Sequence, residues 1–310
     1  MSYVNVVFVL FCVMAGLLPI TAGFAGEGIH PPWEESPEGG IVFTVPGIDN
    51  IPDLYGDIVD PDLTIFLGGN EFMVMPEIVK AFKKAHPQYG RVYYETLPPG
   101  IIEEQVRKGS LVIGNLRITL QPDLFTGGKE KIKKLDAEGW FDETVSYAGN
   151  RLAIMVHKKN PKNIHTIDDL GRSDVNVSMP DPEIEDIAKK IIKLYSKAGD
   201  DKLRKKIMEE KTGAGTTFIT QIHHRQTPVR IMEGLSDAGP VWYTEAYFQK
   251  TIGNPLDIVE IPLSETTVST SAAGRMKSAP HKQAASDFLQ FLRKDEAQAI
   301  FRKYGFSAPE

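Results

Sequence analysis

One short stretch, QIHHRQTP, has an unusual density of hydrogen-bond donors. It places His223, His224 and Arg225 just before an expected helix, with Thr227 as its N-cap and Pro228 at its first position. A helix N-terminus presents unpaired N–H groups and the positive end of the helix dipole, which favour anions. We therefore interpret the stretch as an anion-facing loop. Arg225 would either touch the ligand or form a salt bridge that closes two parts of the molecule.

A metal site is the alternative interpretation of the histidine pair. Adjacent residues on a strand or helix point apart, so the pair rarely gives one metal two ligands. A third ligand would have to come from elsewhere, such as Glu95 or His157. The set Glu95, His223 and His224 stays open as a metal site, against the simpler view that the histidines are structural and Glu95 pairs with a surface cation. Otherwise we expect no metal and no cofactor.

The common enzyme signatures are absent from the sequence. It contains no GxSxG elbow, no GxxxxGK[ST] phosphate loop, no HExxH and no GxGxxG. The acidic pair Glu103-Glu104 falls on an expected helix with polar neighbours and indicates a solvated face. We therefore predict a non-catalytic protein, and an enzyme is the disfavoured alternative.

Composition indicates a globular protein with two cores. The chain has 310 residues, 42% hydrophobic and 25% charged, with 35 Lys and Arg against 41 Asp and Glu. Domains cluster near roughly 100–150 residues. The net charge of −6 argues against general nucleic-acid binding, which needs a cationic face.

The first 25 residues carry no charge and predict a signal peptide. An apolar run, Val6–Leu18, precedes a small-residue end at which we expect cleavage after Ala25. No Lys or Arg precedes the run, so an uncleaved anchor is the alternative. Lipidation at Cys12, the one cysteine, fits poorly with the bulky Phe11 before it. We expect export to the periplasm or the extracellular space.

The rest of the chain alternates strand and helix patterns. Residues 26–61 form an extended lead-in, with a short strand at 41–45. Strands are expected at 63–67, 91–95, 111–118, 151–157 and 174–179, and helices at 101–108 and 183–197. Met75, Ile78, Val79 and Phe82 have the spacing of a buried helix face. The rhythm predicts an α/β fold with mostly parallel sheets flanked by helices.

Five segments in order carry a family resemblance: LTIFLGGNEFMVMPEIVKAFKKAHP, YAGNRLAIMVHKKNPKNIHTIDDL, SMPDPEIEDIAKKI, GPVWYTEAY and ASDFLQFLRKDEAQAIFRKYGF. With them the chain resembles the type II periplasmic solute-binding proteins of ABC transporters, in particular the molybdate- and tungstate-binding branch. The resemblance implies two lobes with a ligand cleft between them. Lobe one would be 62–147 plus 250–306 and lobe two 150–246, with hinges near 147–150 and 246–251.

The resemblance also implies contact residues. Asn70 stands where the molybdate binders carry a ligand-contacting serine, and Thr96 to Gly100 replaces their serine-rich loop. Glu183 lies in the loop that gives a backbone N–H, and Tyr243 matches their hydroxyl-donating tyrosine. Two departures are Glu71 and Glu95, which bring negative charge near an anion site. The full predicted ligand-binding set is Asn70, Thr96, Gly100, Glu183, Arg225, Thr227 and Tyr243.

The predicted function is therefore capture of a small solute for ABC-transporter uptake. We expect the solute to be a tetrahedral oxyanion such as molybdate or tungstate, passed to a membrane ABC permease by a monomer. Micromolar binding needs about 8 kcal/mol, and a charge-assisted hydrogen bond gives roughly 1.5–3 kcal/mol, so loops of both lobes must contribute. A ligand-sensing or metal-binding protein on the same fold is the alternative.

Overall fold

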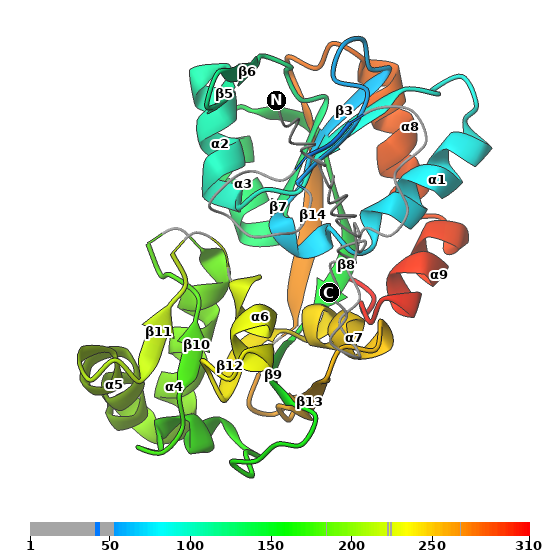
Figure 1. Ribbon diagram of the computed structural model, residues 1–310. Coiled ribbons are helices and arrows are strands. Elements are labelled where there is room, and N and C mark those ends of the chain that lie inside the picture. Colours follow the sequence, from blue (N-terminus) through cyan, green and yellow to red (C-terminus); the bar gives the residue numbers. More distant parts are fainter. Residues whose placement is uncertain (1–40, 44–52, 184, 222, 224, 267) are drawn as a thin grey trace, which may run out of the picture.

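The chain folds into two α/β lobes, one above the other in Figure 1. The computed structural model describes residues 41–43, 53–183, 185–221, 223, 225–266 and 268–310. The expected signal peptide, 1–25, lies outside the described residues. Each lobe is built on one sheet, and the two-lobed α/β prediction is confirmed.

Lobe one contains a sheet in the order β1-β2-β4-β3-β7-β14-β8. Its strands are β1 (Ile41–Phe43), β2 (Leu54–Gly56), β3 (Leu63–Phe66), β4 (Val92–Glu95), β7 (Leu124–Gly128), β8 (Phe141–Asn150) and β14 (Ser269–Met276). Only β3 runs parallel to its two neighbours, β4 and β7. The other pairs in this sheet are antiparallel, because part of the lead-in folds back on β4 and β14 returns from lobe two.

Helices cover lobe one: α1 (Met75–Ala85), α2 (Pro99–Lys108), α3 (Lys129–Ala137), α8 (Lys282–Leu292) and α9 (Asp295–Lys303). The predicted apolar face of α1 is buried, and Phe82 packs edge-on against Phe288 and Phe291 of α8. The expected strand at 111–118 is instead a hairpin of β5 (Leu111–Ile113) and β6 (Leu116–Ile118). Gly114 has φ +57°, a left-handed conformation that turns the chain between them.

Lobe two contains a sheet in the order β11-β10-β12-β9-β13. Its strands are β9 (Leu152–His157), β10 (Val177–Met179), β11 (Thr217–Ile219), β12 (Ala238–Trp242) and β13 (Leu256–Glu260). Its helical segments are the 3₁₀ turn η2 (Ile167–Gly171), the π-helical segment η3 (Lys206–Glu210), and the helices α4 (Asp186–Lys205), α5 (Lys211–Gly213), α6 (Gln226–Met232) and α7 (Tyr243–Thr251). β10 is parallel to β11 and β12, whereas β9 is antiparallel to both of its neighbours. Both sheets are thus mixed rather than mostly parallel.

The second crossing between the lobes lies later in the chain than expected. β13 pairs with β9, so Leu256–Glu260 belongs to lobe two and the chain returns between residues 260 and 269. The first crossing joins β8 to β9 at 150–152, next to the expected 147–150. Helix α7 lies between the lobes, where Phe248 packs edge-on against Phe72 of lobe one.

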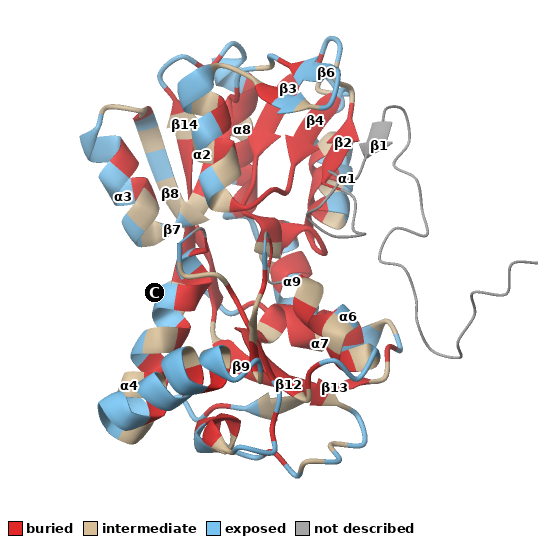
Figure 2. Cartoon of the chain, turned by 60° about the vertical axis from the view of Figure 1, so that its left-hand side comes forward, coloured by how far each residue is buried: buried red, intermediate tan, exposed pale blue. Residues whose placement is uncertain are grey.

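Buried strands form the centre of both lobes, as the red strands of Figure 2 show. β3, β4 and β12 are buried along their whole length. Such strands place the loops that follow them rigidly. Among the described residues, no helix combines the length and apolar character needed to cross a membrane.

Candidate ligand-binding site

The loops that follow β3 and β4 in lobe one meet the loop that follows β11 in lobe two. In open α/β sheets such loops line the ligand site. The 3₁₀ turn η1 (Gly69–Glu71) follows β3, and an ideal Cβ built on Gly69 would lie only 2.1 Å from Nε2 of His223. The backbone of lobe one therefore touches the imidazole of lobe two. This contact places two of the expected anion-facing loops against each other.

Arg225 joins the two lobes through a buried ion pair. Its Nη2 donates to Oδ1 of Asp53, and the two side chains are 1% and 0% exposed. The same nitrogen lies 3.3 Å from the carbonyl oxygen of Thr96, and the guanidinium carbon lies 5.2 Å from the ring centre of Phe72. Asp53, Thr96 and Phe72 all belong to lobe one. Arg225 thus forms the lobe-closing salt bridge that the sequence left as one of its two possible roles.

His223 is fully buried, and one hydrogen bond determines which ring nitrogen carries the proton in the neutral form. Its Nδ1 accepts the backbone N–H of Arg225 at 3.0 Å, so the neutral ring carries its proton on Nε2, which faces Gly69. Within the described residues, no group of three His, Cys, Asp or Glu side chains is placed to hold a metal ion. His224 lies outside the described residues, so the alternative metal set with Glu95 stays a prediction.

Glu95 is buried among polar side chains rather than paired with a surface cation. Its Oε1 accepts the Tyr93 hydroxyl at 2.8 Å and Nε2 of Gln105 at 3.0 Å. Oε2 has no hydrogen-bond partner among the described residues. Burial raises the pKa of Glu95 to about 7, although both hydrogen bonds act to lower it. The negative charge expected here is therefore partly neutralised at neutral pH.

Glu71, the last residue of the turn η1, is a second buried carboxyl. It accepts the hydroxyl of Tyr147 and, at 3.5 Å, that of Thr126. Thr126 also accepts the backbone N–H of Gly68 at 3.2 Å, so the same network positions the turn. Burial raises the pKa of Glu71 to about 7. The position of Glu71 next to Asn70 in the sequence does not indicate its hydrogen bonds with Tyr147 and Thr126, which are distant along the chain.

These two carboxyls predict a pH-dependent stability. Each has a pKa raised from 4.5 to about 7 in the folded protein, so its stabilising effect is complete below about pH 4.5 and is lost as the pH rises through 7. At about 1.36 kcal/mol per pKa unit, the loss is roughly 3 kcal/mol for each.

We expect the thermal unfolding midpoint to fall between pH 5 and 8. Glu95→Gln should flatten the fall by about half, and Glu104→Gln on the exposed face of α2 should leave it unchanged. An equal slope in wild type and Glu95→Gln would contradict this origin.

Three predicted residues of lobe one have different surroundings. Asn70 is half-buried within η1, and it does not cap α1, whose N-cap is Val74. Thr96 is buried beside Arg225, and its Oγ1 has no hydrogen-bond partner among the described residues. Gly100 is exposed in the first turn of α2. The structure therefore brings Thr96 to Arg225 and leaves Gly100 at the surface.

Two predicted residues of lobe two make contacts within their own lobe. The N–H of Glu183 donates to Oδ1 of Asp181 at 2.8 Å, and the Glu183 side chain is exposed. Thr227 does not cap α6, because that helix begins at Gln226. Its Oγ1 lies 2.9 Å from the hydroxyl of Ser178 on β10, and both are buried. The predicted N-cap is thus wrong.

Tyr243 packs beside the first crossing between the lobes. The guanidinium carbon of Arg151 lies 3.8 Å from its ring centre, and the ring stacks on Tyr247 at 5.9 Å. A Cβ on Gly305 would lie 3.2 Å from the same ring. The ring therefore sits between the first crossing and the C-terminal segment of lobe one.

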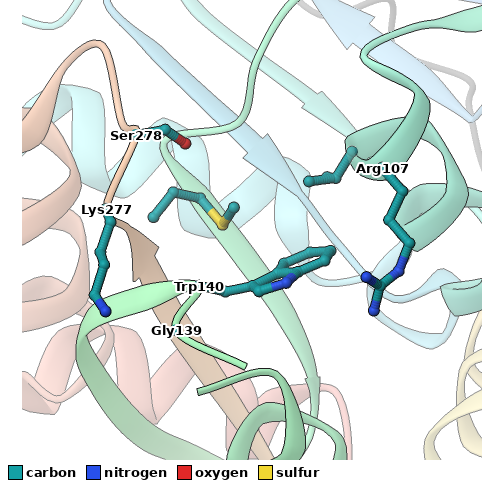
Figure 3. Close-up of a pocket in the computed structure, with 7 residues that line it drawn as sticks. Arg107, Gly139, Trp140, Lys277 and Ser278 are labelled. Atoms are coloured by element: carbon teal, nitrogen blue, oxygen red, sulfur yellow. The ribbon is translucent and has the colours of Figure 1, made fainter. Parts of the chain in front are cut away.

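A separate open pocket lies within lobe one (Figure 3). It is lined by Val106, Arg107, Gly139, Trp140, Met276, Lys277 and Ser278. Arg107 lies over the Trp140 ring and is paired with Glu103 and Glu138 at 2.9 and 2.8 Å. Lobe two contributes nothing to the lining. The meeting of the lobes at Arg225 is the better candidate for an anion.

Comparison with known proteins agrees with this architecture. A model of the bacterial extracellular solute-binding protein family matches residues 63–307. The chain belongs to that family. The Bacillus subtilis (strain 168) protein YvgL, described as an ABC transporter substrate-binding lipoprotein, is 24% identical to this solute-binding protein over 79% of the chain and 86% of its own length.

Two solved structures share the fold of this solute-binding protein. The periplasmic molybdate-binding protein of Azotobacter vinelandii is 18% identical, with a TM-score of 0.65 over 80% of this chain and 100% of its own. The sulfate-binding protein SubI of Mycobacterium tuberculosis H37Rv is 20% identical, with a TM-score of 0.61 over 79% of this chain and 85% of its own. At these identities the likeness concerns the fold. The family match supports an ABC-transporter substrate-binding protein that takes a small solute to a membrane permease.

Proposed function

We propose that this solute-binding protein captures a small tetrahedral oxyanion, such as molybdate or tungstate, between its lobes for ABC-transporter uptake. The observation that carries the proposal is the buried guanidinium of Arg225 at the meeting of the lobes. A guanidinium gives an oxyanion paired, charge-assisted hydrogen bonds. The raised pKa values of Glu71 and Glu95 reduce the repulsion that two carboxylates would otherwise exert. The ligands named for the two solved structures, molybdate and sulfate, are of the same chemical class.

The proposed contacts are centred on Asn70, Thr96 and Arg225, which come from loops at the meeting of the lobes. Gly100, Glu183, Thr227 and Tyr243 remain proposed contacts that would have to change partners or surroundings on binding. We further propose that the protein is a monomer, exported by a signal peptide that is cleaved after Ala25. The mass of the secreted protein tests the cleavage, since retention of residues 1–25 would indicate an anchor.

A thermal-shift panel tests the proposed ligand class. Molybdate, tungstate, sulfate, phosphate, small carboxylates and zinc would be compared with buffer alone. A ligand at 100 times its dissociation constant adds about 2.7 kcal/mol of stability, so the midpoint should rise by several degrees for at least one oxyanion. Isothermal titration should then give one site per chain. A response to zinc alone, lost in His223→Ala, would replace the oxyanion proposal with the metal site.

A further inference from the structure

Asp53 belongs to a segment that precedes the part of the chain matched by the family, which begins at residue 63. The segment is an integral part of lobe one. β2 pairs antiparallel with β4, with Leu54 opposite Glu95, and the carbonyl oxygen of Asp53 accepts the N–H of Thr96 at 2.8 Å. These backbone bonds place the Asp53 carboxylate beside the loop that follows β4.

The partner of this carboxylate comes from the other lobe. Arg225 follows β11 of lobe two, and the pair is almost completely buried. Removing two charges from water is costly, and the loss is recovered only when the charges meet with good geometry. Removing one partner alone leaves a buried charge without compensation. The pair lies where the two lobes meet, so opening the lobes would separate the two charges.

We propose that Asp53 is an internal counter-ion, which holds the lobes closed in the ligand-free protein and which an oxyanion must displace from Arg225. The inference rests on the proposed function only for the identity of the competing anion. Asp53 then determines specificity, because a ligand binds only if it interacts with the guanidinium better than a covalently tethered carboxylate does. The segment before residue 63 thereby becomes part of the binding site.

Asp53→Asn tests the proposal, because it removes the charge and keeps the shape. Small-angle X-ray scattering of the ligand-free proteins should give a larger radius of gyration for Asp53→Asn than for wild type. Sodium molybdate or sodium sulfate should return the variant to the wild-type value. Titration should show anion binding at least ~10-fold tighter in the variant, the effect of one charge-assisted hydrogen bond no longer opposed. The matched control is Asp60→Asn, an exposed carboxylate of the same segment that pairs with Arg91.

The outcomes separate this inference from the proposed function. An unchanged radius of gyration in ligand-free Asp53→Asn, or weaker anion binding by it, would overturn the inference. If Asp53→Asn is open but neither it nor the wild-type protein binds molybdate or sulfate, the counter-ion role of Asp53 is supported. The same result would overturn the oxyanion function. If Asp53→Asn does not fold, the double variant Asp53→Asn/Arg225→Gln removes both charges together. It too should be open without ligand, and a closed double variant would overturn the inference.

Discussion

Arg225→Ala is expected to weaken oxyanion binding at least ~100-fold. A guanidinium can donate two charge-assisted hydrogen bonds to one oxyanion, and each is worth roughly 1.5–3 kcal/mol. The variant also leaves the Asp53 carboxylate, which is 0% exposed, without its guanidinium. Because an uncompensated buried charge is unfavourable, the lobes should open and expose it to water. Isothermal titration with the oxyanion that responds in the thermal-shift panel measures the first effect.

Two further variants separate charge from geometry at this position. Arg225→Lys keeps the charge but loses the planar fork, so it should bind the anion with intermediate affinity. Arg204→Ala removes a surface arginine of lobe two that pairs with Asp201 and Glu209, and its binding should equal that of wild type. Wild-type affinity in Arg225→Ala would show that the anion does not contact this guanidinium.

The regular elements of the fold could be predicted because their signals are local. The apolar spacing of α1 from Met75 to Phe82 reports its buried face, and the pattern at 151–157 reports β9. The position of β13 could not be predicted in this way. Its sequence is consistent with either sheet, and only the antiparallel pairing with β9 assigns it to lobe two. The lobe to which a strand belongs is a long-range property, so the second crossing lies later in the chain than the sequence pattern predicts.

The sequence indicates which hydrogen-bond donors belong to the candidate site, but it does not indicate which residues they pair with. The donor-rich stretch before α6 indicated that Arg225 would act between the lobes. Nothing in the sequence indicated Asp53 as its partner, because the two are 172 positions apart and meet only because β2 pairs with β4. The burial of Glu71 and Glu95 is equally non-local. Burial raises their pKa values and depends on how strands and helices pack, whereas the hydrogen bonds from Tyr147 and Tyr93 act to lower those values.

Gly69→Ala is expected to prevent full closure of the lobes and to weaken ligand binding at least ~10-fold. The added Cβ would lie 2.1 Å from Nε2 of His223 and 3.0 Å from Cε1, well inside van der Waals contact. Gly69 is not among the residues with positive φ, so alanine suits its backbone and the clash is only between lobes. Opening the hinge relieves it, and each lobe should keep its own core. The radius of gyration should therefore increase while the thermal unfolding midpoint changes little.

The neighbouring glycine and a compensating variant make this prediction specific. A Cβ on Gly68 meets only the flexible side chain of Asn70, at 3.2 Å, so Gly68→Ala should close and bind almost as wild type does. Adding His223→Ala to Gly69→Ala removes the ring that the new methyl group strikes, so the double variant should regain closure. Because His223 also accepts the N–H of Arg225, the double variant is compared with His223→Ala alone. If Gly69→Ala opens the lobes and the double variant leaves them open, the contact between η1 and His223 does not control closure.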